Sequence, residues 1–582
     1  MTIYDFFSKY NDVYKIDKVR FDRNVDEVLA IDEEEKELYT LIVDILSLHE
    51  DYRHPDKLFG PKMRWEGKRT FDISDLTESD FELLSALDLE KLPIVIATRI
   101  RDVLWVTKKD YKSAIKAAES YLVLFEKTYD NKNWTTCVDM ICRALCIAAQ
   151  TGKNKDLYNS VCETIKASLI KENGKDPLFL SVVLLEQLIE QKYGSYSDYL
   201  DIADNIISFS VEQNHFEHKV EEAYKVKRQL LVWGKQSTHD CDMDLVAYYE
   251  SKAEKKSEAI NDLFISIKAL EKAIHIARNN QEPEKAAVLL RKLGELQKQV
   301  PGQMAKISHS VDMKEPHDKI VKLFEDTSFT EDLWTLTQLI HIYTKDELRK
   351  QINEEGNFFS GMFGASLLDG EGRRVIDLPP LHGNETNEHV IELHMFRKLT
   401  EYTDISGRTA IYWALQEINR KHKFDEKDLL FIFNECAIVR PGREKILASG
   451  FNMALHSRFY EALHILAPQA ENTFRYIAEE NGGLVYTLED DDTSNAKTLS
   501  SIFDIPELVD CYDPDYLFTF RGLLNEKAGS NLRNMIAHGI LEPGAANSGS
   551  SIYFCFVFFK IFVATSHGFY MKLDEEKNED DN

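Results

Sequence analysis

A long succession of amphipathic segments dominates the first half of the chain. Small and apolar residues recur at spacings of three and four in residues 111–122, and the pattern returns in residues 257–277 and 283–290. This spacing places them on one face of a helix. Residues 76–305 are therefore predicted to form helical pairs, similar to a TPR-like solenoid although the intervals between them are uneven.

The pattern changes between residues 345 and 385, where glycines and Pro379-Pro380 interrupt helical periodicity. Residues 365–377 are typical of a strand, a turn and a second strand. The glycines lack the spacing and the Lys-Ser/Thr of a phosphate-binding loop, so no nucleotide site is predicted there.

Helical patterns resume at Asn387 and include a long helix over residues 459–477. The apolar run 552–559 ends at Lys560 and is too short to span a bilayer, so a buried helix is expected. We predict a mainly all-α protein in five parts: a mixed segment (1–75), a TPR-like scaffold (76–305), a connecting region with short strands (306–386), a helical bundle (387–573) and a disordered acidic tail (574–582).

Composition narrows the class of protein. The 582 residues are 43% hydrophobic, which is typical of folded domains, and the first residues are polar rather than signal-like. A cytoplasmic location is expected, and the eight cysteines fit reduced thiols. Cys137, Cys142 and Cys146 are expected in the core. His382, His389, His394 and Glu392 match no metal motif, so neither a metal nor a cofactor is predicted.

The net charge of -28 argues against a broad surface for nucleic acid. Any RNA contact must be local. Two basic clusters can supply it, residues 420–423 and the segment with Arg440 and Arg443, although solvated helix ends explain both equally well. The acidic run 489–492 is expected to be solvated.

Residues 530–539 combine an Arg, an Asn and a His in a short predicted helix. Ser530 or Asn531 is expected to cap its start, and Gly539 its end. Asn534 and His538 are four residues apart and share a face, whereas Arg533 lies about 140° from His538. An Arg can hold a phosphodiester and a His can transfer a proton near neutral pH, so the segment offers parts for RNA cleavage without a metal.

The spacing of Arg533, Asn534 and His538 resembles the Arg-Asn-x-x-x-His motif of the HEPN superfamily. The wider block Asn-Leu-Arg-Asn-x-x-Ala-His-Gly is similar to that of a large uncharacterised bacterial family with a HEPN-like C-terminal domain. Residues 466–475 and 98–105 resemble further segments of that family.

The resemblance implies a metal-independent endoribonuclease that acts as a homodimer, in antiphage defence or a stress response. Arg533 would bind the scissile phosphate, His538 would act as general acid or base, and Asn534 would position His538. Glu471 would hold Arg533 from a facing helix. Ile540 stands where one toxin variant carries a Tyr, which argues against that type.

A second interpretation remains open. In helical bundles, an Arg and a His near a helix end are often a hydrogen-bonded pair with a structural role. The chain would then be a non-catalytic scaffold that dimerises through its C-terminal bundle and binds a protein partner along the N-terminal helices.

Overall fold

The structure is a computed structural model that describes residues 1–10, 28, 30–50, 58–65, 67–130, 134–152, 155–213, 217–254, 260–305, 310–354, 361–489 and 493–580. The chain forms two compact units, Met1–Leu293 and Gly294–Asn582. Helix predominates in the described part, as the sequence predicts, and the strands there form small two-stranded antiparallel sheets.

The first unit begins with helices that share one core. Buried residues of this core come from α1, α4, α5 and α6, including Ile3, Ile42, Leu84 and Ile100. The segment 1–75 therefore packs directly onto the first scaffold helices. The elements here are α1 (Ile3–Phe7), η2 (Glu33–Glu35), α4 (Lys36–Ser47), β1 (His49–Glu50), β2 (Phe59–Gly60), β3 (Arg64–Trp65), β4 (Lys68–Arg69), η4 (Ile73–Asp75), α5 (Glu78–Ala86), η5 (Leu89–Lys91) and α6 (Ile94–Lys108).

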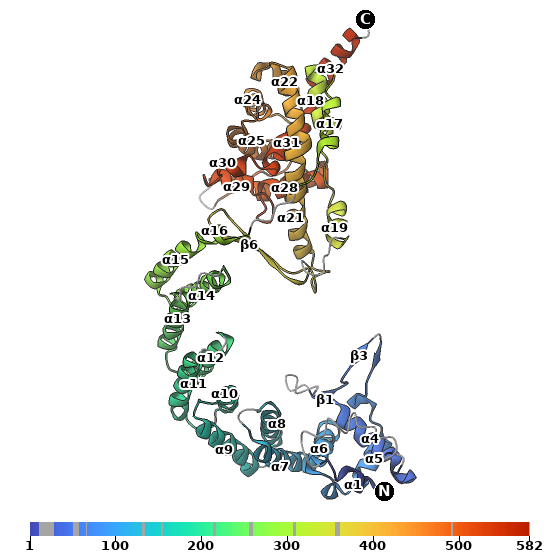
Figure 1. Ribbon diagram of the computed structural model, residues 1–582, viewed down its shortest axis with the longest axis vertical. Coiled ribbons are helices and arrows are strands. Elements are labelled where there is room, and N and C mark those ends of the chain that lie inside the picture. Colours follow the sequence, from blue (N-terminus) through green and yellow to red (C-terminus); the bar gives the residue numbers. More distant parts are fainter. Residues whose placement is uncertain are drawn as a thin grey trace. The chain divides into compact units, whose positions relative to one another are not determined.

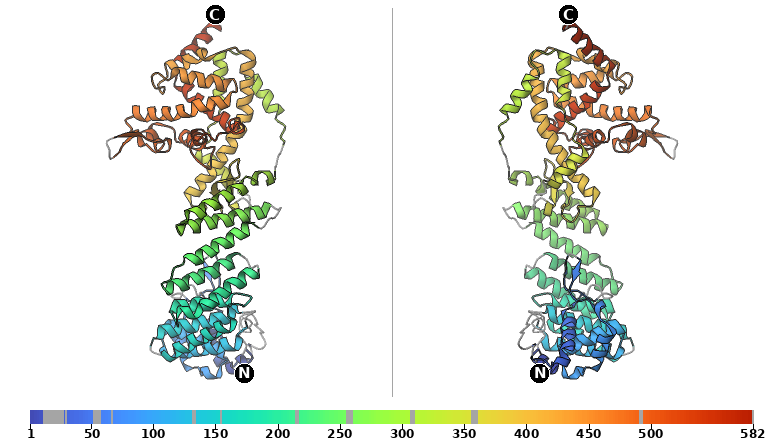
Figure 2. Two further views of the ribbon diagram at one scale, coloured as in Figure 1. Left: turned by 90° about the vertical axis from the view of Figure 1, so that its left-hand side faces the viewer. Right: turned by 90° about the vertical axis from the view of Figure 1, so that its right-hand side faces the viewer.

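Helical hairpins follow, as the amphipathic pattern predicts. Ala114, Ala117 and Ala118 are fully buried, and such small side chains let adjacent helices approach closely. Figure 2 shows these helices, coloured blue to green, in successive rows. They are α7 (Tyr111–Thr128), α8 (Thr135–Thr151), α9 (Lys155–Glu172), α10 (Leu180–Gln191), η6 (Tyr196–Tyr199), α11 (Leu200–Glu212), α12 (Glu217–Trp233), α13 (His239–Glu254), α14 (Ile260–Asn279) and α15 (Pro283–Gln297).

A buried ion pair connects α6 to α8. Asp102 accepts hydrogen bonds from Arg143 Nε at 2.8 Å and Arg143 Nη2 at 2.6 Å, and a third from the hydroxyl of Tyr121 at 3.0 Å. Both charged side chains are almost completely buried. The bidentate geometry offsets the cost of removing these charges from water.

The second unit starts with short elements and a β-hairpin. β5 (Ala365–Leu368) pairs antiparallel with β6 (Arg374–Leu378), which confirms the predicted strand, turn and strand. The helices before the hairpin are α16 (Val300–Gln303), α17 (Lys314–Lys322), α18 (Phe329–Gln338) and α19 (Lys345–Glu354). Phe324, Leu333 and Leu336 belong to the main core of this unit, so the bundle includes residues assigned to the connecting region from sequence.

Helix α31 (Gly549–Thr565) lies at the centre of the bundle (Figure 1). It is buried on nearly every side, as expected for the run 552–559, and Phe558 and Phe562 contact Phe451 of α24. The surrounding elements are α21 (Glu388–Ser406), the π-helix η7 (Gly407–Ile411), α22 (Tyr412–Lys421), η8 (Glu426–Leu429), α23 (Leu430–Asn434), α24 (Glu444–Leu455), α25 (Phe459–Glu480), β7 (Tyr486–Leu488), β8 (Ser494–Ala496), α26 (Leu499–Ile502), α27 (Pro506–Cys511), α28 (Pro514–Leu524), α29 (Leu532–Ala537), α30 (Pro543–Ala546) and α32 (His567–Asp580).

The acidic tail differs from its prediction. Residues 574–580 continue α32 rather than forming a disordered segment. Glu576 accepts hydrogen bonds from the hydroxyls of Ser328 at 2.6 Å and Thr330 at 2.7 Å. These contacts attach the helix to the start of α18 and explain its order.

Candidate functional site

The candidate segment is the short helix α29, which packs against α25 and α28 (Figure 1). Leu532 is 1% exposed and anchors the helix in the main core. The preceding loop folds back onto α28, where the amide of Ser530 donates to the carbonyl of Gly522. A Cβ at Gly529 would lie 2.0 Å from that carbonyl oxygen, so this close approach requires glycine.

One end of α29 differs from the predicted cap and the other agrees with it. Asn531 is the N-cap residue in a left-handed conformation with φ of 49°, and its side chain accepts no backbone hydrogen bond, so the predicted cap is wrong. Gly539 has φ of 67° and confirms the predicted stop. The amide of Ile540 donates to the carbonyl of Met535, which completes a Schellman motif and leaves His538 at the C-cap.

Arg533 is anchored by α25, in the contact predicted for Glu471. Arg533 Nε donates to Glu471 Oε2 at 3.0 Å. The other oxygen, Oε1, accepts from Arg475 Nη2 at 2.8 Å. Glu471 is 15% exposed and Arg533 31% exposed, so the carboxylate is half-buried while part of the guanidinium reaches solvent. A single carboxylate thus joins two arginines, and Arg533 has nitrogens left for an external acceptor.

Asn534 does not orient His538 as the spacing suggests. Its amide nitrogen donates to Asn531 Oδ1 at 2.7 Å, and its oxygen accepts a long hydrogen bond of 3.4 Å from Arg533. Asn534 is the third residue of α29, and its side chain turns back to the N-cap residue instead of forward. Side chains on a helix point towards its N-terminus, and this ordinary direction brings Asn534 to Asn531, three residues earlier.

His538 is exposed at the end of α29. Within the described residues its imidazole makes no hydrogen bond, and only its backbone amide is bonded, to Asn534. An exposed imidazole can accept or donate a proton. Arg533 and His538 are five residues apart, about 140° on a regular helix, so the spacing predicts that one copy of α29 presents a phosphate-binding group and a proton-transfer group on separate sides.

Arg440 and Arg443, the proposed substrate contacts, differ in their surroundings. Arg440 is half-buried and forms an ion pair with Glu479 near the end of α25. The Cζ atom of its guanidinium lies 5.1 Å from the ring centroid of Tyr476. Arg443 is exposed at the start of α24. Glu479 is two turns beyond Glu471, about 12 Å along the helix axis. Arg440 and Arg533 therefore contact the same helix at separate points.

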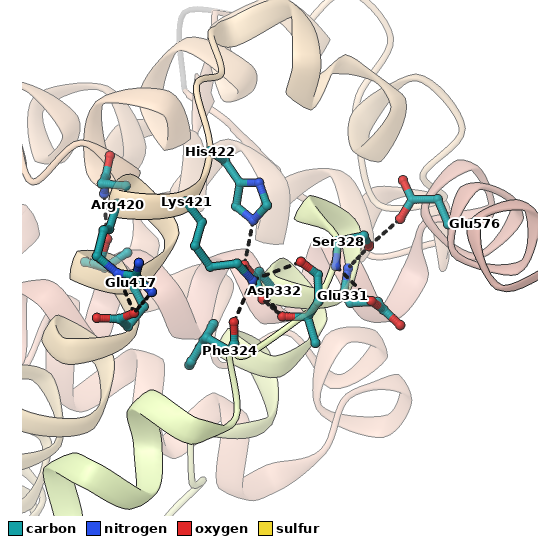
Figure 3. A network of polar contacts seen from close by, with 12 residues as sticks. Phe324, Ser328, Glu331, Asp332, Glu417, Arg420, Lys421, His422 and Glu576 are labelled. Carbon is teal, nitrogen blue, oxygen red and sulfur yellow. Dashed lines mark hydrogen bonds and ion pairs between the residues drawn. The ribbon is translucent and has the colours of Figure 1, made fainter. Parts of the chain in front are cut away.

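The other basic cluster, residues 420–423, is committed to the fold only through Lys421 and His422 (Figure 3). Lys421 Nζ lies 2.9 Å and His422 Nε2 lies 2.6 Å from the fully buried carboxylate of Asp332. Arg420 pairs with Glu417 at 2.7 Å. Lys421 and His422 thus connect α22 to α18, whereas Arg420 and Lys423 remain exposed.

The histidines near the β-hairpin do not converge. His382 pairs with Glu385 at 3.0 Å, and His394 Nε2 lies 2.8 Å from the carbonyl oxygen of Pro379. The described residues contain no group of three potential metal ligands. No described helix is long and apolar enough to cross a membrane. The acidic run 489–492 lies outside the described residues except for Glu489.

Sequence reasoning missed Arg475. It shares Glu471 with Arg533, donates to the carbonyl of Lys497 at 2.9 Å, and its buried Nε has no hydrogen-bond partner in the described structure. The spacing of Glu471 and Arg475, four apart on one helix, was the available signal.

Comparison with known proteins gives one match. Residues 10–160 match a family described as a domain of unknown function, DUF7380. No curated protein and no solved structure matches the chain. The matched residues lie in the first unit and exclude α29, so the resemblance of residues 530–539 to the HEPN superfamily stays a prediction.

Proposed function

We propose that the second unit is a metal-independent endoribonuclease of HEPN type that acts as a homodimer. The proposal rests on one observation. The short helix α29 carries both an exposed His538 and an Arg533 that is anchored by Glu471. Anchoring through Nε fixes the guanidinium, and Nη2, which has no partner among the described residues, is left for a phosphate. Two copies of α29 would bring the arginine of one chain to the histidine of the other.

The reaction needs only these groups and the RNA itself. The ribose 2′-oxygen attacks the adjacent phosphorus, a bond forms between them, and the bond from phosphorus to the 5′-oxygen breaks. His538 would accept the 2′-hydroxyl proton or donate a proton to the leaving 5′-oxygen, and Arg533 would stabilise the added negative charge. The expected products are a 2′,3′-cyclic phosphate and a 5′-hydroxyl.

Replacement of His538 by Ala tests this function. We expect the wild-type protein to cleave RNA in the presence of EDTA, and His538→Ala to lose about 100-fold or more in rate, since general acid-base catalysis typically contributes that much. The measurement is cleavage of end-labelled single-stranded RNA, with the product ends identified by mass spectrometry.

His456→Ala is the matched control, because His456 is also exposed and also caps the C-terminal end of a helix, α24. It should cleave like the wild type. If the wild-type protein leaves a range of RNAs intact, or if both histidine variants cleave equally well, the proposal fails. Thermal unfolding of both variants excludes a loss of fold.

We also propose that the protein acts in a reducing cytoplasm, because the cysteines of the described residues are free thiols. The resemblance also motivates a role in antiphage defence or stress response. The helical hairpins of the first unit would then bind the protein partner that controls cleavage.

The alternative is a non-catalytic scaffold that dimerises and binds protein partners. The two ion pairs of Glu471 favour it, because they give Arg533 a structural role. In that case Arg533→Ala would lower stability or dissociate the dimer in sedimentation while no RNA is cut. An intact Arg533→Ala dimer that has lost cleavage would instead support the enzyme.

A further inference from the structure

The first unit contains a pocket between α8 and α10, far along the sequence from α29. Its volume is about 440 Å³, which lies within the usual range for small-molecule sites. Asp139, Cys142 and Cys146 line it from α8, at spacings of three and four that place them on one face of the helix. Gln187 and Glu190 line it from α10, also three residues apart.

The lining carries an excess of negative charge. Arg143 is the cation among the lining residues, and its guanidinium is already neutralised by the two hydrogen bonds to Asp102. Asp139 and Glu190 have no ion pair or hydrogen bond to any part of the chain that the structure describes. Among the described residues, two carboxylates therefore line the same hollow without a counter-charge.

The surroundings of Asp139 disfavour its negative charge. Asp139 and Glu190 are both exposed, yet partial burial of the Asp139 carboxylate raises its pKa to about 6, and the nearby carboxylate of Glu50 adds to the increase. Glu50 itself is paired with Arg99. A cation next to Asp139 would favour its ionised form and offset this cost.

The thiols give the pocket an apolar part. Burial raises the pKa of Cys142 to about 12, so this thiol stays neutral at physiological pH. A neutral cysteine packs like a small hydrophobic residue. The pocket thus combines apolar surface with two carboxylates and the free carboxamide of Gln187, which can accept a hydrogen bond.

We propose that this pocket binds a linear aliphatic ammonium ion, with its charged group at Asp139 and Glu190 and its alkyl stem along Cys142 and Cys146. A free polyamine and the lysine side chain of a partner protein share this chemistry. The proposal does not depend on ribonuclease activity, because every residue that carries it lies in the first unit.

Isothermal titration calorimetry on the full-length protein tests the site with n-pentylamine and with n-pentanol, which has the same stem without the charge. We expect saturable binding of the amine and at least tenfold weaker binding of the alcohol. Asp139→Asn and Glu190→Gln should each weaken amine binding by tenfold or more. Asp156→Asn, at an exposed carboxylate in the first turn of α9, should bind like the wild type.

Two further ligands distinguish the sources. Tighter binding of spermidine than of a capped Gly-Lys-Gly peptide supports a free polyamine, and the reverse supports a lysine side chain. A Gly-norleucine-Gly peptide controls for the backbone. The proposal is overturned if no amine binds, if alcohol and amine bind equally, or if both charge-removing variants bind the amine like the wild type. The comparison of amine with alcohol needs only the wild-type protein, so it stands even if a variant fails to fold.

Discussion

The side chain of Lys560 lies in the otherwise apolar helix α31, and its amine donates to the carbonyl of Ile340 at 2.8 Å. Burial lowers the pKa of this amine. The folded chain therefore releases the proton at lower pH than the unfolded chain, whose lysines titrate near about 10.4. Between the pKa of the folded state and that of the unfolded state, the unfolded chain binds more protons. Lys560 therefore makes the folded state more stable as pH rises.

Replacement of Lys560 by Met removes this titration. We expect Lys560→Met to be most stable relative to the wild type at pH 7. The difference in the free energy of unfolding should shift in favour of the wild type towards pH 10. Urea unfolding at several pH values measures the difference. Lys445→Met, at an exposed position of α24, should show no such trend. A difference for Lys560→Met that does not change with pH would contradict this account.

Residue spacing predicted only part of the site. The contact of Glu471 with Arg533 was expected from a resemblance, and the left-handed stop at Gly539 followed from the conformational freedom of glycine. The pairing of Asn534 with His538 was not found, because the Asn534 side chain points towards the helix N-terminus and bonds to Asn531. A helix projection shows which residues share a face, but not which neighbour takes the hydrogen bond.

At the scale of elements, the junction of α21 with α31 depends on two glycines. A Cβ at Gly549 would lie 1.8 Å from the carbonyl oxygen of Asp404, and a Cβ at Gly407 would lie 1.9 Å from the carbonyl oxygen of Gly549. The amide of Gly549 also donates to Asp404 Oδ1 at 2.7 Å. The start of α31 thus contacts the backbone of α21 directly, near the point where the π-helix η7 begins.

Gly549→Ala should therefore destabilise the bundle by about 3 kcal/mol, because overpacking against backbone cannot be relieved by a side-chain rotation. Gly544→Ala is the control, since a Cβ there meets nothing within 4 Å. Chemical denaturation followed by circular dichroism gives both free energies. Equal stability of the two variants would show that the helices can separate without cost.

Helices were the most predictable elements, since apolar periodicity identifies α7 and α25, and a continuous apolar run indicates the buried α31. The order of α32 was not predictable, because Glu576 is held by Ser328 and Thr330 almost 250 residues earlier in the chain. An acidic composition indicates disorder only when no distant partner accepts the segment. The core of the second unit likewise includes Phe324 and Leu333, which lie before the predicted start of the bundle.

At the scale of the whole molecule, the net charge of -28 requires that any RNA be held by a local site. Helical spacing predicts that one copy of α29 offers an arginine and a histidine in different directions. A homodimer with two-fold symmetry would place each motif opposite its equivalent and form two composite sites. Each site would then use Arg533 of one chain and His538 of the other.

Mixed dimers test this arrangement directly. Arg533→Ala and His538→Ala should each be inactive alone. In a mixed dimer, one site loses both groups and the other keeps an intact Arg533 and an intact His538. Random exchange makes half of the dimers mixed, so an equimolar mixture should recover about a quarter of the wild-type rate. Cleavage is measured before and after subunit exchange, with wild type mixed with Arg533→Ala as the reference. If exchange is demonstrated and no activity returns, both groups act within one chain, and the composite site is excluded.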